Sequence, residues 1–182
     1  MKKICVFCGS RSGVRASYRA AAQAFGRALA KANLGLVYGG GRVGLMGDLA
    51  DAMLAAGGYV TGVIPEFLNH REVIHTELQS CHTVTNLFER KAMMLEISDA
   101  FVALPGGIGT LDELLEVIAW RQLRQLDKPI WVLDVERFFA PWLDALRHTA
   151  VEGFVAIEEL DRLLVATSVE ELIARLNVGA TD

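Results

Sequence analysis

The residues of this chain best suited to chemistry stand together in one short stretch, Leu104-Pro105-Gly106-Gly107-Ile108-Gly109-Thr110-Leu111-Asp112-Glu113. An apolar run precedes it and a helical pattern begins at Leu111, so the spacing predicts a strand, a tight glycine-rich turn and a helix N-terminus. Backbone N–H groups converge at such a turn without side chains in the way, and the helix dipole favours negative charge there. The stretch therefore predicts a cradle for an anion such as a phosphate. The Glu113 carboxylate, one turn further on, indicates chemistry on that ligand rather than phosphate binding alone.

Glu113 also has a purely structural interpretation. Thr110-Leu111-Asp112-Glu113 fits a capping box, in which Thr110 caps the helix and the Glu113 carboxylate accepts a hydrogen bond from the cap's backbone N–H. The two interpretations are compatible, because a helix N-terminus keeps the carboxylate ionised until a ligand redirects it. Glu116, three residues on and on the same helix face, is either a second functional carboxylate or an ordinary solvated residue.

Two more glycine-rich turns follow predicted strands. Gly9 and Ser10 come after the first strand and either offer backbone and hydroxyl contacts to a nucleotide or form a plain turn. Gly39-Gly40-Gly41-Arg42-Val43-Gly44 matches the G-x-G-x-x-G pattern of dinucleotide sites. It follows the second strand rather than the first, however, and no acidic residue ends the next strand. We therefore expect Gly40 and Gly41 to contact a mononucleotide rather than NAD.

A basic pair, Arg90-Lys91, lies near the start of another predicted helix. Cations at a helix N-terminus oppose the dipole, so this placement calls for an offsetting partner. An anionic ligand or the Glu113 carboxylate would supply one. The plainer interpretation is a surface pair whose apolar stems cover neighbouring side chains.

The rest of the chain alternates short apolar runs with longer amphipathic patterns. Several runs are apolar throughout, which is typical of parallel strands covered on both faces. In 111–126, apolar residues recur every three or four positions, as in a helix buried on one side. The expected strands are Lys3–Cys8, Leu34–Tyr38, Tyr59–Ile64, Thr83–Thr85, Ala100–Leu104, Ile130–Leu133 and Leu163–Ala166. The expected helices are Tyr18–Ala32, Met46–Ala56, Leu87–Ile97, Leu111–Leu126, Trp142–Glu152 and Val169–Leu176.

This alternation predicts an α/β fold, a doubly wound, Rossmann-like parallel sheet with helices on both faces. Ligands of such sheets bind at the carboxyl ends of the strands, where the three glycine-rich turns lie. Segment 65–83 is long and polar, and we expect an irregular excursion near the mouth of the site. Because no repeat, low-complexity tract or linker interrupts the pattern, we expect residues 1–182 to form a single domain.

Composition excludes several classes of protein. A hydrophobic content of 52% and a charged content of 22% are ordinary for a globular chain. The net charge of −4 gives no electrostatic sign of nucleic acid or of an acidic membrane surface. No apolar run reaches the roughly 18 residues of a membrane span, and the one after Lys3 stops at Gly9, too short for a signal peptide. We therefore expect a cytoplasmic protein.

The three cysteines do not indicate a disulfide framework. Cys5 and Cys8 have C-x-x-C spacing, but on a strand this separation points the two side chains to opposite faces. The histidines and Cys81 supply no recognisable zinc-ligand spacing either. Structural or incidental cysteines are therefore favoured over a redox or metal site.

Taken together, these residues resemble the LOG (lonely guy) family of cytokinin riboside 5′-monophosphate phosphoribohydrolases, many of which were long labelled lysine decarboxylases. The likeness covers nearly the whole chain. Its most specific part is the Arg90-Lys91 pair followed by P-G-G-x-G-T-x-x-E. It is carried by Val6–Ser10, Val37–Gly41, Gly44–Gly47, Arg71–Val73, Glu89–Lys91 and Pro105–Glu113.

The resemblance implies hydrolysis of the N-glycosidic bond of an adenine nucleoside 5′-monophosphate to the free base and ribose 5-phosphate. Arg90 and Glu113 match the catalytic pair of the family, and Glu72 matches a position that contacts substrate. The turn at Gly106, Gly107, Ile108, Gly109 and Thr110 is expected to hold the 5′-phosphate. The other residues that we expect to bind substrate are Gly9, Ser10, Gly40, Gly41, Lys91 and Glu116.

The implied chemistry suits these residue types. Glycosidic cleavage passes through an oxocarbenium-like state, which the Glu113 carboxylate would stabilise while it orients water. Arg90 would clamp substrate oxygens and hold Glu113. No metal or organic cofactor is needed. Decarboxylation generally requires pyridoxal phosphate on a Schiff-base lysine, and nothing marks Lys91 as an activated amine.

Several alternatives stay open from the sequence. Many members have Met-His where this chain has Leu87-Phe88, and a Thr in place of Ala119, so cytokinin nucleotides and plain AMP are both candidate substrates. A nucleotide-binding or sensing protein without turnover is the alternative function, and a Rossmann dehydrogenase comes third. The family likeness also implies a homodimer, for which the apolar helix bearing Trp120 offers a surface.

Overall fold

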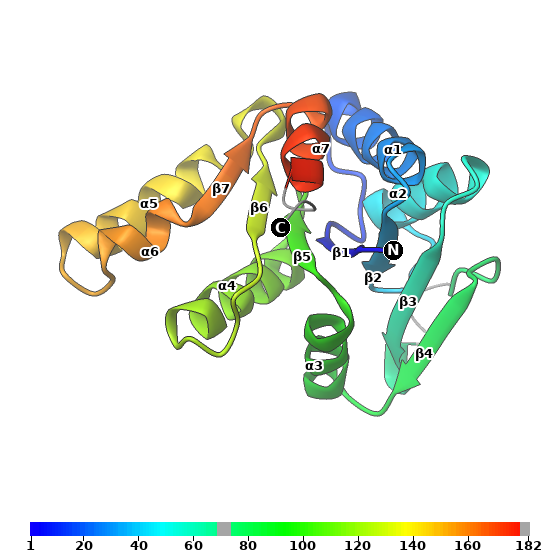
Figure 1. Ribbon diagram of the computed structural model, residues 1–182, viewed down its shortest axis with the longest axis horizontal. Coiled ribbons are helices and arrows are strands. Elements are labelled where there is room, and N and C mark those ends of the chain that lie inside the picture. Colours follow the sequence, from blue (N-terminus) through cyan, green and yellow to red (C-terminus); the bar gives the residue numbers. More distant parts are fainter. Residues whose placement is uncertain (69–73, 179–182) are drawn as a thin grey trace.

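The strands of this chain assemble into one parallel sheet in the computed structural model, which describes residues 1–68 and 74–178 (Figure 1). The described residues form a seven-stranded sheet in the order β4-β3-β2-β1-β5-β6-β7, and every neighbouring pair runs parallel. The predicted doubly wound, Rossmann-like fold class is therefore confirmed. The strands are β1 (Lys3–Phe7), β2 (Gly35–Tyr38), β3 (Val60–Pro65), β4 (Ser80–Val84), β5 (Ala100–Ala103), β6 (Ile130–Leu133) and β7 (Leu163–Ala166).

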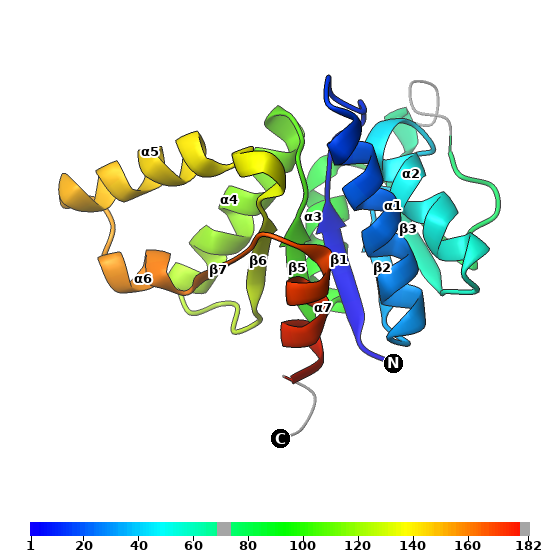
Figure 2. The same ribbon diagram turned by 90° about the horizontal axis from the view of Figure 1, so that it is seen from above.

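Helices cover both faces of this sheet. In Figure 1, α1, α2 and α7 lie along one side, and α3 and α4 lie along the other. The helices are α1 (Ala16–Lys31), α2 (Gly44–Ala55), α3 (Leu87–Ile97), α4 (Ile108–Gln122), α5 (Ala140–Val151), α6 (Ile157–Asp161) and α7 (Val169–Val178). In both views α5 and α6 extend outward from the β7 edge (Figure 2). Across the described residues, no helix combines the length and the apolar character needed to cross a bilayer.

The central strands are apolar throughout because each side chain enters one of two cores. Along β1, Ile4 and Val6 pack with α1 and α2, whereas Cys5 and Phe7 pack with α3 and α4. Every residue of β2, β5 and β6 is buried. Burial of apolar surface on both faces stabilises the sheet and fixes the strand ends that carry the turns.

Four sequence-based expectations about elements need correction. The weak strand expected at Thr83–Thr85 is β4, which begins at Ser80 inside the segment expected to be irregular. Its middle residues are exposed because it is an edge strand, so no clear apolar pattern marks it. Helix α4 begins at Ile108, three residues before the expected start, and ends earlier, at Gln122. The five-residue α6 was not predicted.

Candidate active site

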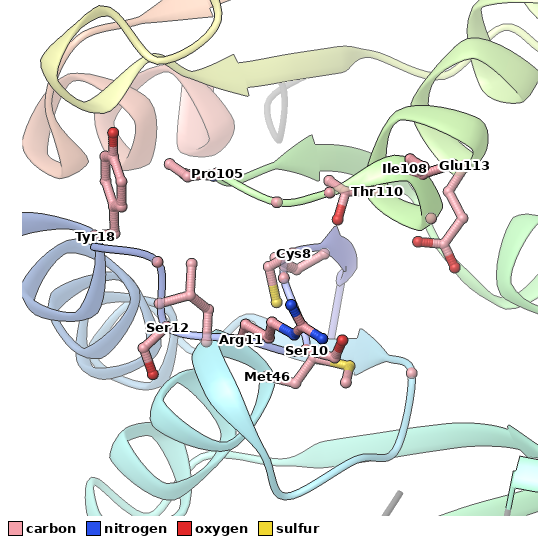
Figure 3. A pocket seen from close by; sticks show the side chains of 18 of the residues that line it. Cys8, Ser10, Arg11, Ser12, Tyr18, Met46, Pro105, Ile108, Thr110 and Glu113 are labelled. Carbon is pink, nitrogen blue, oxygen red and sulfur yellow. The ribbon is translucent and has the colours of Figure 1, made fainter. Parts of the chain in front are cut away.

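The crevice of this sheet opens between β1 and β5. From β1 the chain adds strands outward to β4, and from β5 it adds strands in the opposite direction to β7. Such a reversal parts the loops that follow the two central strands and leaves a crevice at their carboxyl ends. A cavity of about 610 Å³ lies there, within the size range of small-molecule sites. Figure 3 shows Tyr18 at one end of it and Glu113 at the other.

Two glycine-rich turns form the floor of this cavity by direct backbone contact. The Gly9 N–H donates a hydrogen bond to the Pro105 carbonyl at 3.1 Å. A Cβ at Gly9 would lie 3.3 Å from the Cα of Gly106 and 2.9 Å from the Arg11 carbonyl oxygen, so any side chain here would push the turns apart. The turns after β1 and β5, which the sequence singled out separately, are therefore brought together. Ser10 lies on the cavity wall beside them.

The N-terminus of α4 faces into the cavity. Its N-cap is Gly107, which makes no side-chain capping bond, and Ile108 and Gly109 line the cavity. The first N–H groups of a helix have no partner within the helix, and the dipole places partial positive charge there. Gly107 has no side chain that could accept a hydrogen bond from these donors. The predicted anion cradle therefore lies on the cavity wall, and its ligand stays a prediction.

The capping box expected at Thr110 and Glu113 is wrong. Because α4 begins at Ile108, Thr110 lies within the first turn rather than at the cap, and it is buried. A Cβ at Gly106 would overlap Oγ1 of Thr110, so this threonine packs beneath the turn. Glu113 lies in the second turn of α4 and lines the cavity.

Arg90 and Glu113 meet at the inner end of the cavity. Nη2 of Arg90 lies 4.0 Å from Oε1 of Glu113, and the two side chains are only 11% and 16% exposed. Arg90 Nε is buried without a hydrogen-bond partner among the described residues. A Cβ at Gly39 would overlap Nη2 of Arg90, so the residue after β2 must be glycine for the guanidinium to reach this place. A guanidinium with donors to spare and a carboxylate therefore stand side by side in a mostly buried site.

Lys91 and Glu116 lie together, but behind the cavity wall. Nζ of Lys91 lies 2.6 Å from Glu116 and 3.3 Å from Asp112, so these ion pairs join α3 to α4. Partial burial lowers the pKa of the Lys91 ammonium, but the Glu116 and Asp112 carboxylates outweigh this effect and raise the pKa above its ordinary value. Neither Lys91 nor Glu116 lines the cavity. In this structure they fix the spacing of the two helices that carry Arg90 and Glu113.

The other predicted site residues fall in two places. Gly40 and Gly41 are buried and do not line the cavity, whereas the preceding residue, Gly39, does. Glu72 lies outside the described residues. Of the segment 65–83 that was expected at the mouth of the site, no described residue lines the cavity.

Sequence reasoning missed the aromatic end of the cavity, where Tyr18 and Phe138 line the wall. Their ring centroids lie 5.6 Å apart in an edge-to-face arrangement. Phe138 follows β6, after Glu136 and Arg137, which both have positive φ angles of 50° and 60°. The available signal was that this loop, like the others, leaves the carboxyl end of a strand.

Cys5 and Cys8 point to opposite faces of the sheet, as their spacing predicts. Cys5 and Cys8 are buried, unbonded to each other, and belong to the cores on opposite faces of the sheet. Burial raises the pKa of both thiols, and the Glu113 charge adds to this effect. Within 1–68 and 74–178, no three His, Cys, Asp or Glu side chains gather in a group that could hold a metal ion.

Comparisons with known proteins identify the family of this chain. A family model described as "Possible lysine decarboxylase" matches residues 46–176, which include Arg90 and Glu113. Over 176 residues the chain is 44% identical to the cytokinin riboside 5′-monophosphate phosphoribohydrolase of Rhodococcoides fascians, covering 96% of this chain and 89% of that one. The chain belongs to the LOG family. It is also 44% identical over 175 residues to the phosphoribohydrolase LOG1 of Arabidopsis thaliana, covering 96% of this chain and 82% of that protein.

The LOG fold is shared more widely than the LOG sequence. The molybdenum cofactor carrier protein of Chlamydomonas reinhardtii superposes with a TM-score of 0.76, over 100% of this chain and 99% of the carrier. Its sequence identity is 18%, so this likeness concerns the fold alone.

The decarboxylase description does not fit the residues of this LOG protein. That chemistry generally needs pyridoxal phosphate on a lysine that can form a Schiff base, which requires a neutral amine. Lys91 is instead held as an ammonium between two carboxylates. Among the described residues, the wall of the cavity contains no lysine.

Proposed function

We propose that this LOG-family protein hydrolyses the N-glycosidic bond of adenine-type nucleoside 5′-monophosphates and releases the free base and ribose 5-phosphate. The observation that carries the proposal is the placement of the Arg90–Glu113 pair in the same cavity as the open N-terminus of α4. The curated names of relatives that are 44% identical support this activity.

The proposed binding mode follows from the cavity walls. The 5′-phosphate binds at the N–H groups of Ile108, Gly109 and Thr110, where the helix dipole offsets its charge. Gly9 and Ser10 contact it from the turn after β1. Because Glu113 lies one helical turn beyond this cradle, a ribose bound through its phosphate presents its anomeric carbon toward the carboxylate.

The proposed reaction divides the work between two side chains. The Glu113 carboxylate stabilises positive charge on the sugar as the bond to the base breaks, and it orients and deprotonates the attacking water. The hydroxide adds to the anomeric carbon, and the proton taken from water ends on the base, which leaves with the electron pair of the broken bond. The Arg90 guanidinium holds the carboxylate in place and donates to substrate oxygens through its remaining N–H groups. The low exposure of both side chains strengthens these interactions, since fewer waters screen the charges.

We further propose that two copies of the chain associate through α3 and α4. Large apolar side chains are exposed on these helices and at the C-cap of α4, namely Leu87, Phe88, Ile108, Leu115, Trp120 and Leu123. The proposal takes them as one apolar patch of the kind that marks protein interfaces. Phe88 stands where many relatives have His. Its side chain is 79% exposed and does not line the cavity, so this difference leaves the Arg90–Glu113 pair unaltered.

Product analysis tests the proposed activity. Purified protein is incubated with AMP and, separately, with isopentenyladenosine 5′-monophosphate, and the free base and ribose 5-phosphate are quantified. Release of both products from at least one nucleotide is expected, and the relative rates identify the preferred base. The matching nucleosides without phosphate are the control, and they should react about a hundredfold more slowly or worse, because phosphate binding contributes to the transition state. Tight nucleotide binding without any base release would favour the sensor instead.

A further inference from the structure

His75 is a buried histidine outside the cavity, and its ring contacts join separate parts of the chain. It is 1% exposed, and its Nε2 lies 2.8 Å from Oδ1 of Asp51 on α2. Its Nδ1 accepts a hydrogen bond from the Glu77 backbone N–H at 3.3 Å. Because Nδ1 accepts, the ring proton is on Nε2 and is donated to the Asp51 carboxylate. A fully buried imidazole is thereby attached to a carboxylate whose side chain is 53% exposed.

The main chain around this ring is joined to the second glycine-rich loop, residues 39–44. The His75 N–H donates to the Gly40 carbonyl at 3.1 Å. The preceding residue, Ile74, pairs with Gly41 in an antiparallel bridge. Arg42, within the loop, also approaches Asp51, with Nε 4.0 Å from the carboxylate. One imidazole and one carboxylate thus attach the loop to α2.

The loop in turn limits where Arg90 can lie. A Cβ at Gly39 would overlap Nη2 of Arg90, so the Gly39 backbone is in direct contact with the guanidinium. Nη2 is also the atom that faces Glu113, at 4.0 Å. Gly40 has a φ of 77°, a conformation that favours glycine, so the loop has one specific path past the arginine. A shift of the loop therefore moves the guanidinium relative to the Glu113 carboxylate.

We propose that His75 is a positioning residue. Its hydrogen bonds to Asp51 and to Gly40 hold the glycine-rich loop against Arg90, although neither His75 nor Asp51 lines the cavity. The effect on turnover rests on the function proposed above, whereas the effect on the loop does not. A misplacement of about 1 Å costs roughly a hundredfold in rate, so a loop shift of a fraction of an ångström is expected to cost about tenfold.

Four variants separate positioning from general destabilisation. His75→Leu removes both ring hydrogen bonds, and Asp51→Ala removes the acceptor of one of them by changing a half-exposed side chain. His75→Gln restores an N–H donor near the place of Nε2. His148→Leu replaces a histidine on α5 whose side chain is 70% exposed, and serves as the control.

Steady-state kinetics with the preferred nucleotide give the first readout. We expect kcat to fall about tenfold in His75→Leu and in Asp51→Ala, while KM changes by less than about threefold, because the phosphate cradle is intact. His75→Gln and His148→Leu should keep kcat within about threefold of the parent. The double variant His75→Leu/Asp51→Ala should lose no more than either single variant, since both break the same bond.

Amide hydrogen exchange of residues 39–44 gives a second readout that does not depend on turnover. Exchange should be about tenfold faster in His75→Leu and Asp51→Ala than in His148→Leu, because the loop has lost its attachment. Unchanged kcat in folded Asp51→Ala overturns the proposal, and so does unchanged loop exchange. Absence of base release by the parent protein overturns the proposed function instead, and loop exchange then decides by itself whether His75 holds the loop.

Discussion

Arg90 and Glu113 depend on small neighbours whose lack of a side chain leaves room for them. Gly39 provides the space that Nη2 of Arg90 occupies, and Gly106 provides the space above Thr110. Neither residue has a positive φ, so backbone conformation does not require glycine at these two positions. Their role is close approach, which brings the arginine and the phosphate turn to the same cavity.

A methyl group at Gly39 tests this role. Gly39→Ala should lower kcat at least about tenfold because it displaces the guanidinium from Glu113. The free energy of unfolding should change by less than about 1 kcal/mol, since the overlapped atoms end flexible side chains. Gly35→Ala, at the other end of β2, is the control, where a Cβ would lie 3.1 Å from the terminal methyl of Met1. Equal kcat in the two variants would show that Gly39 does not position Arg90.

At this scale the sequence revealed part of the site. The sequence predicted that the turn at 106–110 and Glu113 share one site, because glycines and a carboxylate stand in one short motif, and both line the cavity. The helix dipole indicated that Arg90 needs an acidic partner, and only the family resemblance selected Glu113 over an anionic ligand, because the pairing depends on how two helices pack. Gly39, Tyr18 and Phe138 were not predicted for the same reason. They line one cavity only because the fold brings distant segments of the chain together at the sheet edge.

Helix α3 begins at Leu87 as expected, and its N-terminus is capped by side chains, which was not predicted. Asn86 Oδ1 accepts from the Glu89 N–H at 2.9 Å, and the Glu89 carboxylate accepts from the Thr85 N–H at 3.0 Å. The backbone hydrogen bond from Thr85 lowers the pKa of Glu89. Helix α4 starts on glycines, which are poor helix formers, so propensity concealed its first turn.

Removing this cap should affect both stability and turnover. Asn86→Ala should lower the free energy of unfolding by about 1 kcal/mol in urea titrations, the usual contribution of an N-cap. It should also lower kcat severalfold, because the first turns of α3 place Arg90. Ser168→Ala is the matched control, since Ser168 Oγ accepts from the Glu171 N–H at the start of α7. Loss of stability with unchanged kcat in Asn86→Ala, as in the control, would contradict a link between this cap and Arg90.

The whole molecule follows from the alternation of apolar runs and amphipathic helices. That alternation was sufficient to predict a doubly wound sheet, and the switch between β1 and β5 then places the cavity. Edge strand β4 was only partly predicted because its middle residues face solvent. The five-residue α6 is too short to show a helical period.

The proposed association between copies would bury the exposed apolar side chains of α3 and α4. The parent protein should have twice the 19.9 kDa mass of one chain in light-scattering measurements. Leu123→Glu, at the C-cap of α4 where the side chain is 69% exposed, should weaken dimerisation by about a hundredfold, because a charge would be buried against the partner. Val151→Glu, at a site 80% exposed on α5, should leave the mass unchanged. A monomeric parent at micromolar concentration would rule out the proposed dimer.

The central claim is that the Glu113 carboxylate, held by Arg90 beyond the phosphate cradle, cleaves the glycosidic bond. The most direct test compares kcat and nucleotide affinity in the parent and in Glu113→Gln, which keeps the shape of the side chain but removes its charge. We predict that kcat falls by roughly a hundredfold or more while nucleotide binding stays within about threefold, since the phosphate cradle is untouched. Base release by Glu113→Gln at the rate of the parent protein would contradict the account.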